Sequence, residues 1–160
     1  MPLIYADTSA LLAYFHPRDV FSRTVTDTAR AQAPDFVYWT FIRFELRHNL
    51  RRARINRYGE AAWQALRAAE GTQARLRWQA NLQCDSLLES AEELSAQYAL
   101  DYGAGSADFL HIAAARRLAF TSGMDEFWTC DAAQAAAAKV AGLSVRLFEL
   151  KHPPAQSPAT

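Results

Sequence analysis

The sequence has few cysteines, no excess of charge of either sign and no long apolar run. Its 160 residues include 17 Lys and Arg against 17 Asp and Glu, so the formal net charge at pH 7 is zero. A neutral chain has no overall attraction to nucleic acid, and any such contact must come from a local patch of charge. No stretch approaches the roughly 20 apolar residues of a membrane span. The N-terminus lacks a basic segment followed by a long apolar one, so we expect no signal peptide and no membrane association.

The two cysteines, Cys84 and Cys130, stand far apart in the sequence. Without a sign of secretion, two such residues are expected to be buried free thiols rather than a disulfide, and the protein is expected to be cytoplasmic. Two isolated cysteines also provide no zinc site.

Several common catalytic motifs are absent as well. The sequence has no Walker motif and no G-x-S-x-G nucleophile motif. The segment from Gly103 to Asp108 lacks the third glycine of a dinucleotide-binding fingerprint. The run Asp7-Thr8-Ser9 lacks the second aspartate of a D-x-D phosphatase, which makes a phosphatase of similar layout the weakest alternative.

The apolar patterns predict alternating strands and helices. Strands are expected at residues 3–6, 36–39, 126–130 and 144–150, while residues 71–84 are ambiguous and leave room for a short strand. Helices are expected at residues 9–15, 21–32, 41–57, 60–70, 86–100, 106–118 and 132–141. This order predicts an α/β fold, a three-layer sandwich with a mainly parallel central sheet flanked by helices. We expect one domain at residues 1–150 and a proline-rich, disordered tail at residues 151–160.

Four acidic residues stand where such a fold places ligands. Asp7 and Asp131 each follow a predicted strand and precede a helix, Asp108 lies in the first turn of its helix, and Glu45 lies early in a basic helix. Ligands of parallel sheets bind beyond the carboxyl ends of the strands. Each acid also has a structural interpretation, because aspartates near helix N-termini satisfy free N–H groups and a helical glutamate often pairs on the surface. For the first helix we expect Thr8 or Ser9 as the N-cap.

If the four carboxylates converge, they repel one another. A pair of like charges at about 4 Å costs on the order of 4 kcal/mol at an effective dielectric constant of 20. Protons or cations must compensate such a cluster. Oxygen ligands suit Mg²⁺ or Mn²⁺, and bound divalent ions can support the hydrolysis of phosphodiesters.

Four segments together resemble a known family. They are "IYADTSALLAYF", the glutamate of "FIRFELRHNL", "SADFLHIAAARRL" and "FWTCDAAQAAAAKVAGLSV". In this order they resemble the acidic motifs of PIN-domain ribonucleases, and they are most similar to the VapC toxins of bacterial toxin–antitoxin pairs. The resemblance covers roughly residues 1–150, and its first and last motifs are the most specific.

The resemblance implies an acidic catalytic pocket formed by Asp7, Glu45, Asp108 and Asp131. In it, Asp7 and Asp108 would be the main Mg²⁺ ligands, and Asp131 would contribute directly or through water. Glu45 would hold a second ion or orient the attacking water.

Three hydroxyl groups would support these carboxylates. Thr8, Ser9 and Thr129 would donate hydrogen bonds that fix them in place. Cys130 stands where many relatives carry an aromatic residue, and we expect it to face away from the neighbouring aspartate.

The implied function is that of a Mg²⁺-dependent endoribonuclease, with Mn²⁺ as the other candidate ion, acting as the toxin of a type II toxin–antitoxin pair. The implied partners are an RNA substrate, a small antitoxin protein and a second copy of the chain in a homodimer. The alternatives are a housekeeping RNA-processing nuclease and a PIN-like module that binds RNA or protein without cutting.

The remaining candidates are basic and aromatic residues. Arg43, Arg47 and Arg51 recur at helical spacing, and this predicts either contacts with RNA phosphates or a solvated basic face. His111, three residues after Asp108, is interpreted as a hydrogen-bonded structural histidine rather than as a ligand. The four tryptophans could stack on bases, but core packing is favoured for Trp39 and Trp128 because both lie in predicted strands.

Overall fold

The computed structural model describes residues 1–150, and the predicted tail at residues 151–160 lies outside them. The strands are β1 (Leu3–Ala6), β2 (Asp35–Tyr38), β3 (Leu76–Trp78), β4 (Glu126–Thr129) and β5 (Val145–Leu147). The helices are α1 (Thr8–Phe15), α2 (Ser22–Gln32), α3 (Thr40–Ala53), α4 (Arg57–Thr72), α5 (Asp85–Tyr102), α6 (Ser106–Ser122) and α7 (Ala132–Val140). The ambiguous segment does contain a strand, β3.

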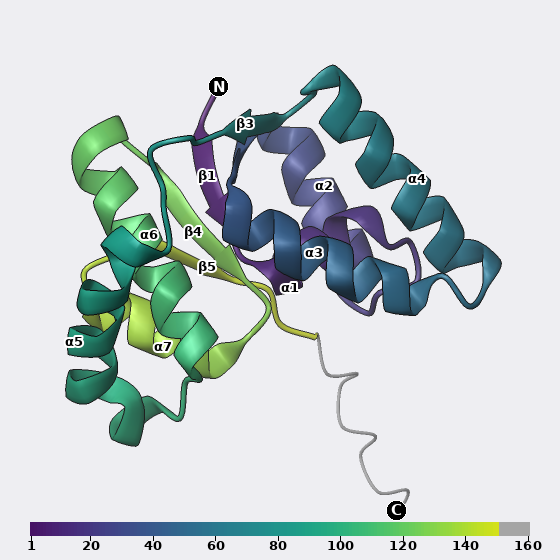
Figure 1. The fold of residues 1–160 in the computed structure, drawn as a ribbon. Helices are drawn as coiled ribbons and strands as arrows, with labels where there is room; N and C mark the ends of the chain where they lie inside the picture. Colours follow the sequence, from purple (N-terminus) through teal and green to yellow (C-terminus); the bar gives the residue numbers. More distant parts are fainter. Residues whose placement is uncertain (151–160) are drawn as a thin grey trace, which may run out of the picture.

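The five strands form one sheet in the order β3-β2-β1-β4-β5, and every neighbouring pair is parallel. Helices α1–α4 gather on one side of the sheet and α5–α7 on the other (Figure 1). This arrangement follows from right-handed crossovers, because the chain moves outward from β1 to β3 and then returns past β1 to β4 and β5. The predicted α/β sandwich with a parallel central sheet is therefore confirmed.

The sheet core is aromatic on both faces. Tyr5 stacks on Phe127 with ring centroids 5.5 Å apart, on the face covered by α6. On the opposite face, Phe36 packs edge-on against Trp128 and against Tyr14 of α1. Trp39 and Trp128 are completely buried, so core packing is confirmed for both. Cys84 and Cys130 are free and only partly buried.

The order in which strands are added to the sheet changes direction at β1, and this switch point is central to the site. From β1 the sheet extends one way to β2 and β3 and the other way to β4 and β5. The carboxyl ends of β1 and β4 therefore flank a crevice of the kind that binds ligands in open parallel sheets. Asp7 follows β1 directly, and Asp131 lies just beyond β4.

Two local predictions are wrong. The long basic helix ends at Ala53 rather than at residue 57, because Asn56 accepts hydrogen bonds from the backbone N–H groups of Tyr58 and Gly59 and so starts a new helix. The N-cap of α1 is Asp7 instead of Thr8 or Ser9, since Asp7 Oδ1 accepts from Ala10 N at 2.8 Å. Within residues 1–150, no helix combines the length and the apolar character that crossing a membrane requires.

Candidate active site

The four predicted acids line one pocket at the carboxyl edge of the sheet. Asp7 comes from the β1–α1 junction, Glu45 from α3, Asp108 from the first turn of α6 and Asp131 from the β4–α7 junction. Its volume is about 270 Å³, and Thr8, Ser9, Leu12, Asn49, Ala107 and His111 complete its lining. We call it the acidic pocket. Segments more than 120 residues apart in the sequence meet here because parallel strands deliver their carboxyl ends to the same edge.

Asp7 is the most buried of the four acids, with 4% of its surface exposed. Its Oδ1 accepts from Ser9 Oγ at 2.7 Å and from Ala10 N at 2.8 Å, and its Oδ2 accepts from Thr129 Oγ1 at 2.8 Å. Burial raises the pKa of Asp7 above its ordinary value, although nearby His111 and these hydrogen bonds oppose the rise. The carboxylate is therefore held rigidly but incompletely compensated.

The hydroxyl of Thr129 links Asp7 to the last helix. Thr129 Oγ1 lies 2.8 Å from Asp7 Oδ2 and 2.7 Å from Gln134 Oε1, and it accepts from Asp131 N at 2.9 Å. The single hydroxyl proton of Thr129 cannot be donated to both the carboxylate oxygen of Asp7 and the amide oxygen of Gln134. In addition, Gln134 Nε2 is the one buried side-chain polar atom without a hydrogen-bond partner in the described chain. Turning the amide by half a rotation lets Nε2 donate to Thr129 and leaves the hydroxyl proton for Asp7. We assign that orientation.

A buried chain of hydrogen bonds ends on Glu45. Trp39 Nε1 lies 3.0 Å from Tyr5 Oη, which lies 3.0 Å from His111 Nδ1, and His111 Nε2 lies 2.8 Å from Glu45 Oε2. Because Trp39 can only donate, the Tyr5 proton points to Nδ1 and the His111 proton sits on Nε2, facing Glu45. The chain therefore fixes both the tautomer and the direction of the last donor.

Glu45 is consequently held as a carboxylate. Thr8 Oγ1 donates to the same oxygen at 2.6 Å. Burial alone would raise the pKa of Glu45, but the hydrogen bonds that His111 and Thr8 donate to it lower it overall. Glu45 thus pairs across the site with α6 and α1, and not with an arginine of its own helix.

Asp108 and Asp131 each cap a helix N-terminus. Asp108 lies in the first turn of α6, and Asp131 is the N-cap of α7. Asp108 Oδ2 accepts from Gly105 N at 2.7 Å, and Asp131 Oδ1 accepts from Gln134 N at 3.0 Å. Burial raises the pKa of Asp108, and the charges of Asp131 and Glu45 add to the rise against the opposing Gly105 bond. Asp108 and Asp131 therefore cap helices and line the acidic pocket at the same time, so the structural and the functional interpretations are not alternatives.

The acidic pocket has the chemistry of a divalent-cation site. In the described chain, Asp7, Asp108 and Asp131 form no ion pair with Lys, Arg or His, whereas Glu45 accepts a hydrogen bond from His111. Asp108 Oδ1 and Asp131 Oδ2 accept no hydrogen bond from residues 1–150. Unpaired carboxylate oxygens of this kind suit Mg²⁺ or Mn²⁺.

The arrangement of these oxygens is looser than that of a finished metal cage. Across residues 1–150, no three side chains of His, Cys, Asp or Glu are grouped closely enough to hold one ion. One oxygen of Asp108 and one of Asp131 accept hydrogen bonds from backbone N–H groups at helix N-termini. The donor set fits a partly hydrated cation, which leaves several of its positions to water.

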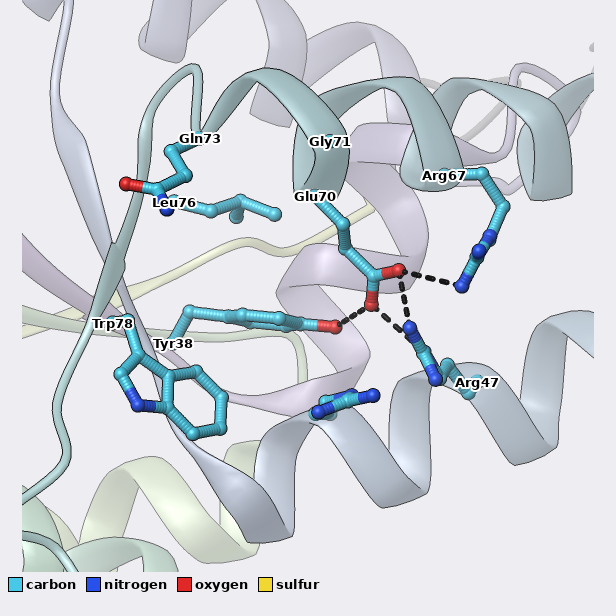
Figure 2. Close-up of a pocket in the computed structure, with 9 residues that line it drawn as sticks. Tyr38, Arg47, Arg67, Glu70, Gly71, Gln73, Leu76 and Trp78 are labelled. Atoms are coloured by element: carbon cyan, nitrogen blue, oxygen red, sulfur yellow. Dashed lines mark hydrogen bonds and ion pairs between the residues drawn. The ribbon is translucent and has the colours of Figure 1, made fainter.

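The three arginines predicted to contact RNA have different surroundings. The guanidinium of Arg47 is held by Glu70 through Nε and Nη2 at 2.8 and 2.6 Å (Figure 2). Arg51 lies over the ring of Trp63, 5.3 Å from its centroid. Arg43 is exposed, and its side chain has no hydrogen bond or ion pair within residues 1–150.

Sequence reasoning named Thr8, Ser9 and Thr129, which donate to Glu45 and Asp7, but missed the residues behind Glu45. Tyr5 and Trp39 read as ordinary core aromatics, and nothing in the sequence relates them to Glu45. His111 was interpreted as a structural histidine, and it is buried and hydrogen-bonded, but it also lines the acidic pocket. Its spacing of three residues from Asp108 was the available signal.

Cys130 differs from the other supporting residues. Its backbone N–H donates to Ser9 Oγ at 2.9 Å, but its side chain is not among those that line the acidic pocket. Burial, and then the charge of Asp7, raise the pKa of its thiol to about 12, so it stays protonated.

Comparison with known proteins agrees with this geometry. No curated relative matches the chain. The family model described as "PIN domain" matches residues 4–140, which include all four acids of the pocket. Because this match covers most of the sequence, the chain belongs to the PIN domain family.

Proposed function

We propose that the protein is a divalent-metal-dependent endoribonuclease. PIN domains are generally nucleases. The observation that carries the proposal for this chain is the meeting of four carboxylates in one pocket, three of them without a basic partner among the described residues. Such a cluster is unfavourable unless cations compensate it.

In this proposal Asp7, Asp108 and Asp131 hold Mg²⁺ or Mn²⁺. A bound ion of this type makes water more acidic and offsets the charge that develops on the phosphate during hydrolysis. Ser9 and Thr129 keep the Asp7 carboxylate in place at the pocket before an ion enters.

Glu45 takes a separate role. Its lowered pKa keeps it ionised, and Thr8 and His111 occupy one of its oxygens. The other oxygen remains available to orient the attacking water or to bind a second ion. Of the three arginines predicted to contact RNA phosphates, Arg43 and Arg51 could do so, whereas Arg47 is engaged by Glu70.

The finer proposal is that the enzyme is a VapC-type toxin, inhibited by a small antitoxin and active as a homodimer in the cytoplasm. It rests on the sequence resemblance of the motifs around Asp7 and Asp131. A gene for a small DNA-binding protein beside its own gene would support this assignment over a housekeeping nuclease. We also propose that residues 1–150 form one nuclease domain.

A non-cutting PIN-like module is the second candidate. It is favoured by the absence, within residues 1–150, of three side chains already arranged around one ion. The two candidates differ in whether RNA is cleaved when Mg²⁺ is added.

The deciding experiment incubates total RNA with the protein in Mg²⁺, in EDTA, and with Asp7→Asn in Mg²⁺. We expect cleavage only in the first case. Asp27→Asn, on the exposed surface of α2, is the matched control and should cut like the wild type. Mapping the new 5′ ends would then identify the target RNA.

Cleavage that persists both in EDTA and with Asp7→Asn would refute the metal mechanism. An absence of cleavage by the wild type in both Mg²⁺ and Mn²⁺ would favour the non-cutting module instead.

A further inference from the structure

A second pocket lies between α3, α4 and the ends of β2 and β3, and none of the four acids of the acidic pocket lines it. Its volume is about 330 Å³, within the range of roughly 300–1,000 Å³ typical of small-ligand sites. Its lining includes Tyr38, Arg43, Arg67, Glu70 and Trp78 (Figure 2). We call it the arginine–tryptophan pocket.

The pocket carries more positive than negative charge. Three guanidinium groups and one carboxylate line it. The carboxylate of Glu70 is already occupied by neighbouring side chains. It accepts two hydrogen bonds from Arg47, one from Tyr38 Oη at 2.5 Å and a longer one from Arg67 at 3.3 Å (Figure 2). Arg43 has no such partner among the described residues, and half of the Arg67 side chain is exposed. Arg43 and Arg67 are therefore available to an anion.

Two aromatic rings form a corner of the same pocket. Trp78 and Tyr38 are cross-strand neighbours on β3 and β2, with ring centroids 6.1 Å apart at an angle of 65°. Tyr38 is buried, but 47% of Trp78 is exposed, on a short edge strand where an exposed indole gains little from packing. An open indole face beside the free guanidinium group of Arg43 matches a base and its phosphate.

Helix α3 separates this pocket from the acidic pocket. Glu45 and Asn49, one turn apart, line the acidic pocket, whereas Arg43 and Arg47 line the second. Since successive helical residues are about 100° apart, the two pairs lie on opposite flanks of the helix. A helix with its side chains is about 10–12 Å across, a distance that a short single strand can bridge.

The outer face of α3 between these flanks carries another aromatic residue. Phe44 is 66% exposed, and its ring is stacked with His48 at a centroid distance of 6.3 Å. By helical spacing, both residues lie on the solvent side, between the flank of Glu45 and the flank of Arg43. A strand crossing α3 would therefore meet a stacking surface on its way.

We propose that the arginine–tryptophan pocket binds one nucleotide of single-stranded RNA, with the base against Trp78 and a phosphate at Arg43. The inference rests on the proposed nuclease function, because the same strand would place another phosphate in the acidic pocket. It adds a nucleotide site remote from the cut, one that positions the substrate across α3.

The test measures the affinity for a short, fluorescein-labelled, mixed-sequence single-stranded RNA by fluorescence anisotropy in EDTA, so that no cleavage occurs. Trp78→Ala should raise Kd about tenfold, the loss expected for one base stack. Trp78→Phe keeps an aromatic face and should retain most of the affinity. Thermal unfolding checks that each variant is folded.

Arg43→Ala supplies an independent reading. Loss of one phosphate contact should reduce the slope of log K against log salt concentration by about 0.7 for a single strand. Arg116→Ala, exposed on α6 and lining neither pocket, is the matched control and should change neither quantity.

Equal affinities for Trp78→Ala and Trp78→Phe, or an unchanged salt slope for Arg43→Ala, would overturn the inference. RNA cleavage by the wild type in Mg²⁺ would still stand in that case, so the failure of this proposal is distinguishable from failure of the nuclease proposal. An acidic protein segment would then be the better candidate for the pocket.

Discussion

The buried chain from Trp39 to Glu45 can be tested by removing one oxygen atom. Tyr5→Phe deletes the hydroxyl that accepts from Trp39 Nε1 and donates to His111 Nδ1. The ring itself is fully buried and stacks on Phe127, so the substitution keeps its packing. The expected loss of stability therefore comes from Trp39 Nε1 and His111 Nδ1, which both lose their hydrogen-bond partner.

The magnitude follows from their burial. Trp39 is completely buried and His111 is 3% exposed, so water reaches neither group easily. A buried donor or acceptor left unsatisfied costs about 1–3 kcal/mol, and two of them give about 2–6 kcal/mol. This is a large part of the roughly 5–15 kcal/mol that stabilises a domain.

Urea denaturation measures this loss directly. With a slope of about 2 kcal/mol per molar, the midpoint should fall by about 1–3 M without a change in slope. Tyr14→Phe is the matched control, because Tyr14 also packs against a core aromatic ring but its hydroxyl has no hydrogen-bond partner within residues 1–150. Equal midpoints for the two variants would show that the chain contributes nothing to the fold and would remove our reason for assigning the His111 tautomer.

Two further predictions concern a glycine contact and a buried charge. Gly59→Ala should destabilise the protein by more than about 2 kcal/mol, although alanine is the better helix former, because the new Cβ would lie 1.7 Å from a backbone oxygen at the end of α3. Gly71→Ala, on the same helix with no atom within 4 Å among the described residues, should instead stabilise it by about 0.5–1 kcal/mol in the same thermal or urea unfolding assay. In metal-free protein, the raised pKa of Asp7 means that the folded state binds more protons than the unfolded state above about pH 4, so stability falls as the pH rises through that window. Asp7→Asn should therefore be more stable than the wild type at pH 7 in EDTA, and an advantage that failed to shrink as the pH fell toward 4 would contradict the shift.

Some of the site could be predicted because its logic is local. Asp7 and Asp131 each stand at the end of an apolar strand and at the start of a helix, and parallel strands bring such positions to one edge. The sequence alone therefore predicts that these two acids lie close together. Asp108 and Glu45 needed the family resemblance, because an acid early in a helix is common for reasons of capping alone.

The partners of each side chain were beyond the reach of the sequence. Arg47 was predicted either to contact RNA phosphates or to lie on a solvated basic face, but Glu70, on a different helix, holds its guanidinium. Glu45 was weighed as half of a surface pair on its own helix, but it binds His111 and Thr8. Both outcomes depend on how α3 is rotated and which helices pack against it, and neither is encoded in the spacing of one segment.

By itself, the sequence determined the order of strands and helices, the parallel sheet and the edge at which the acids gather, because periodicity and strand direction are properties of short segments. Only the tertiary structure decided which carboxylates stay unpaired, which histidine tautomer faces Glu45 and that a second pocket opens across α3. These depend on distances between segments far apart in the chain, and such distances are set by packing the whole core at once.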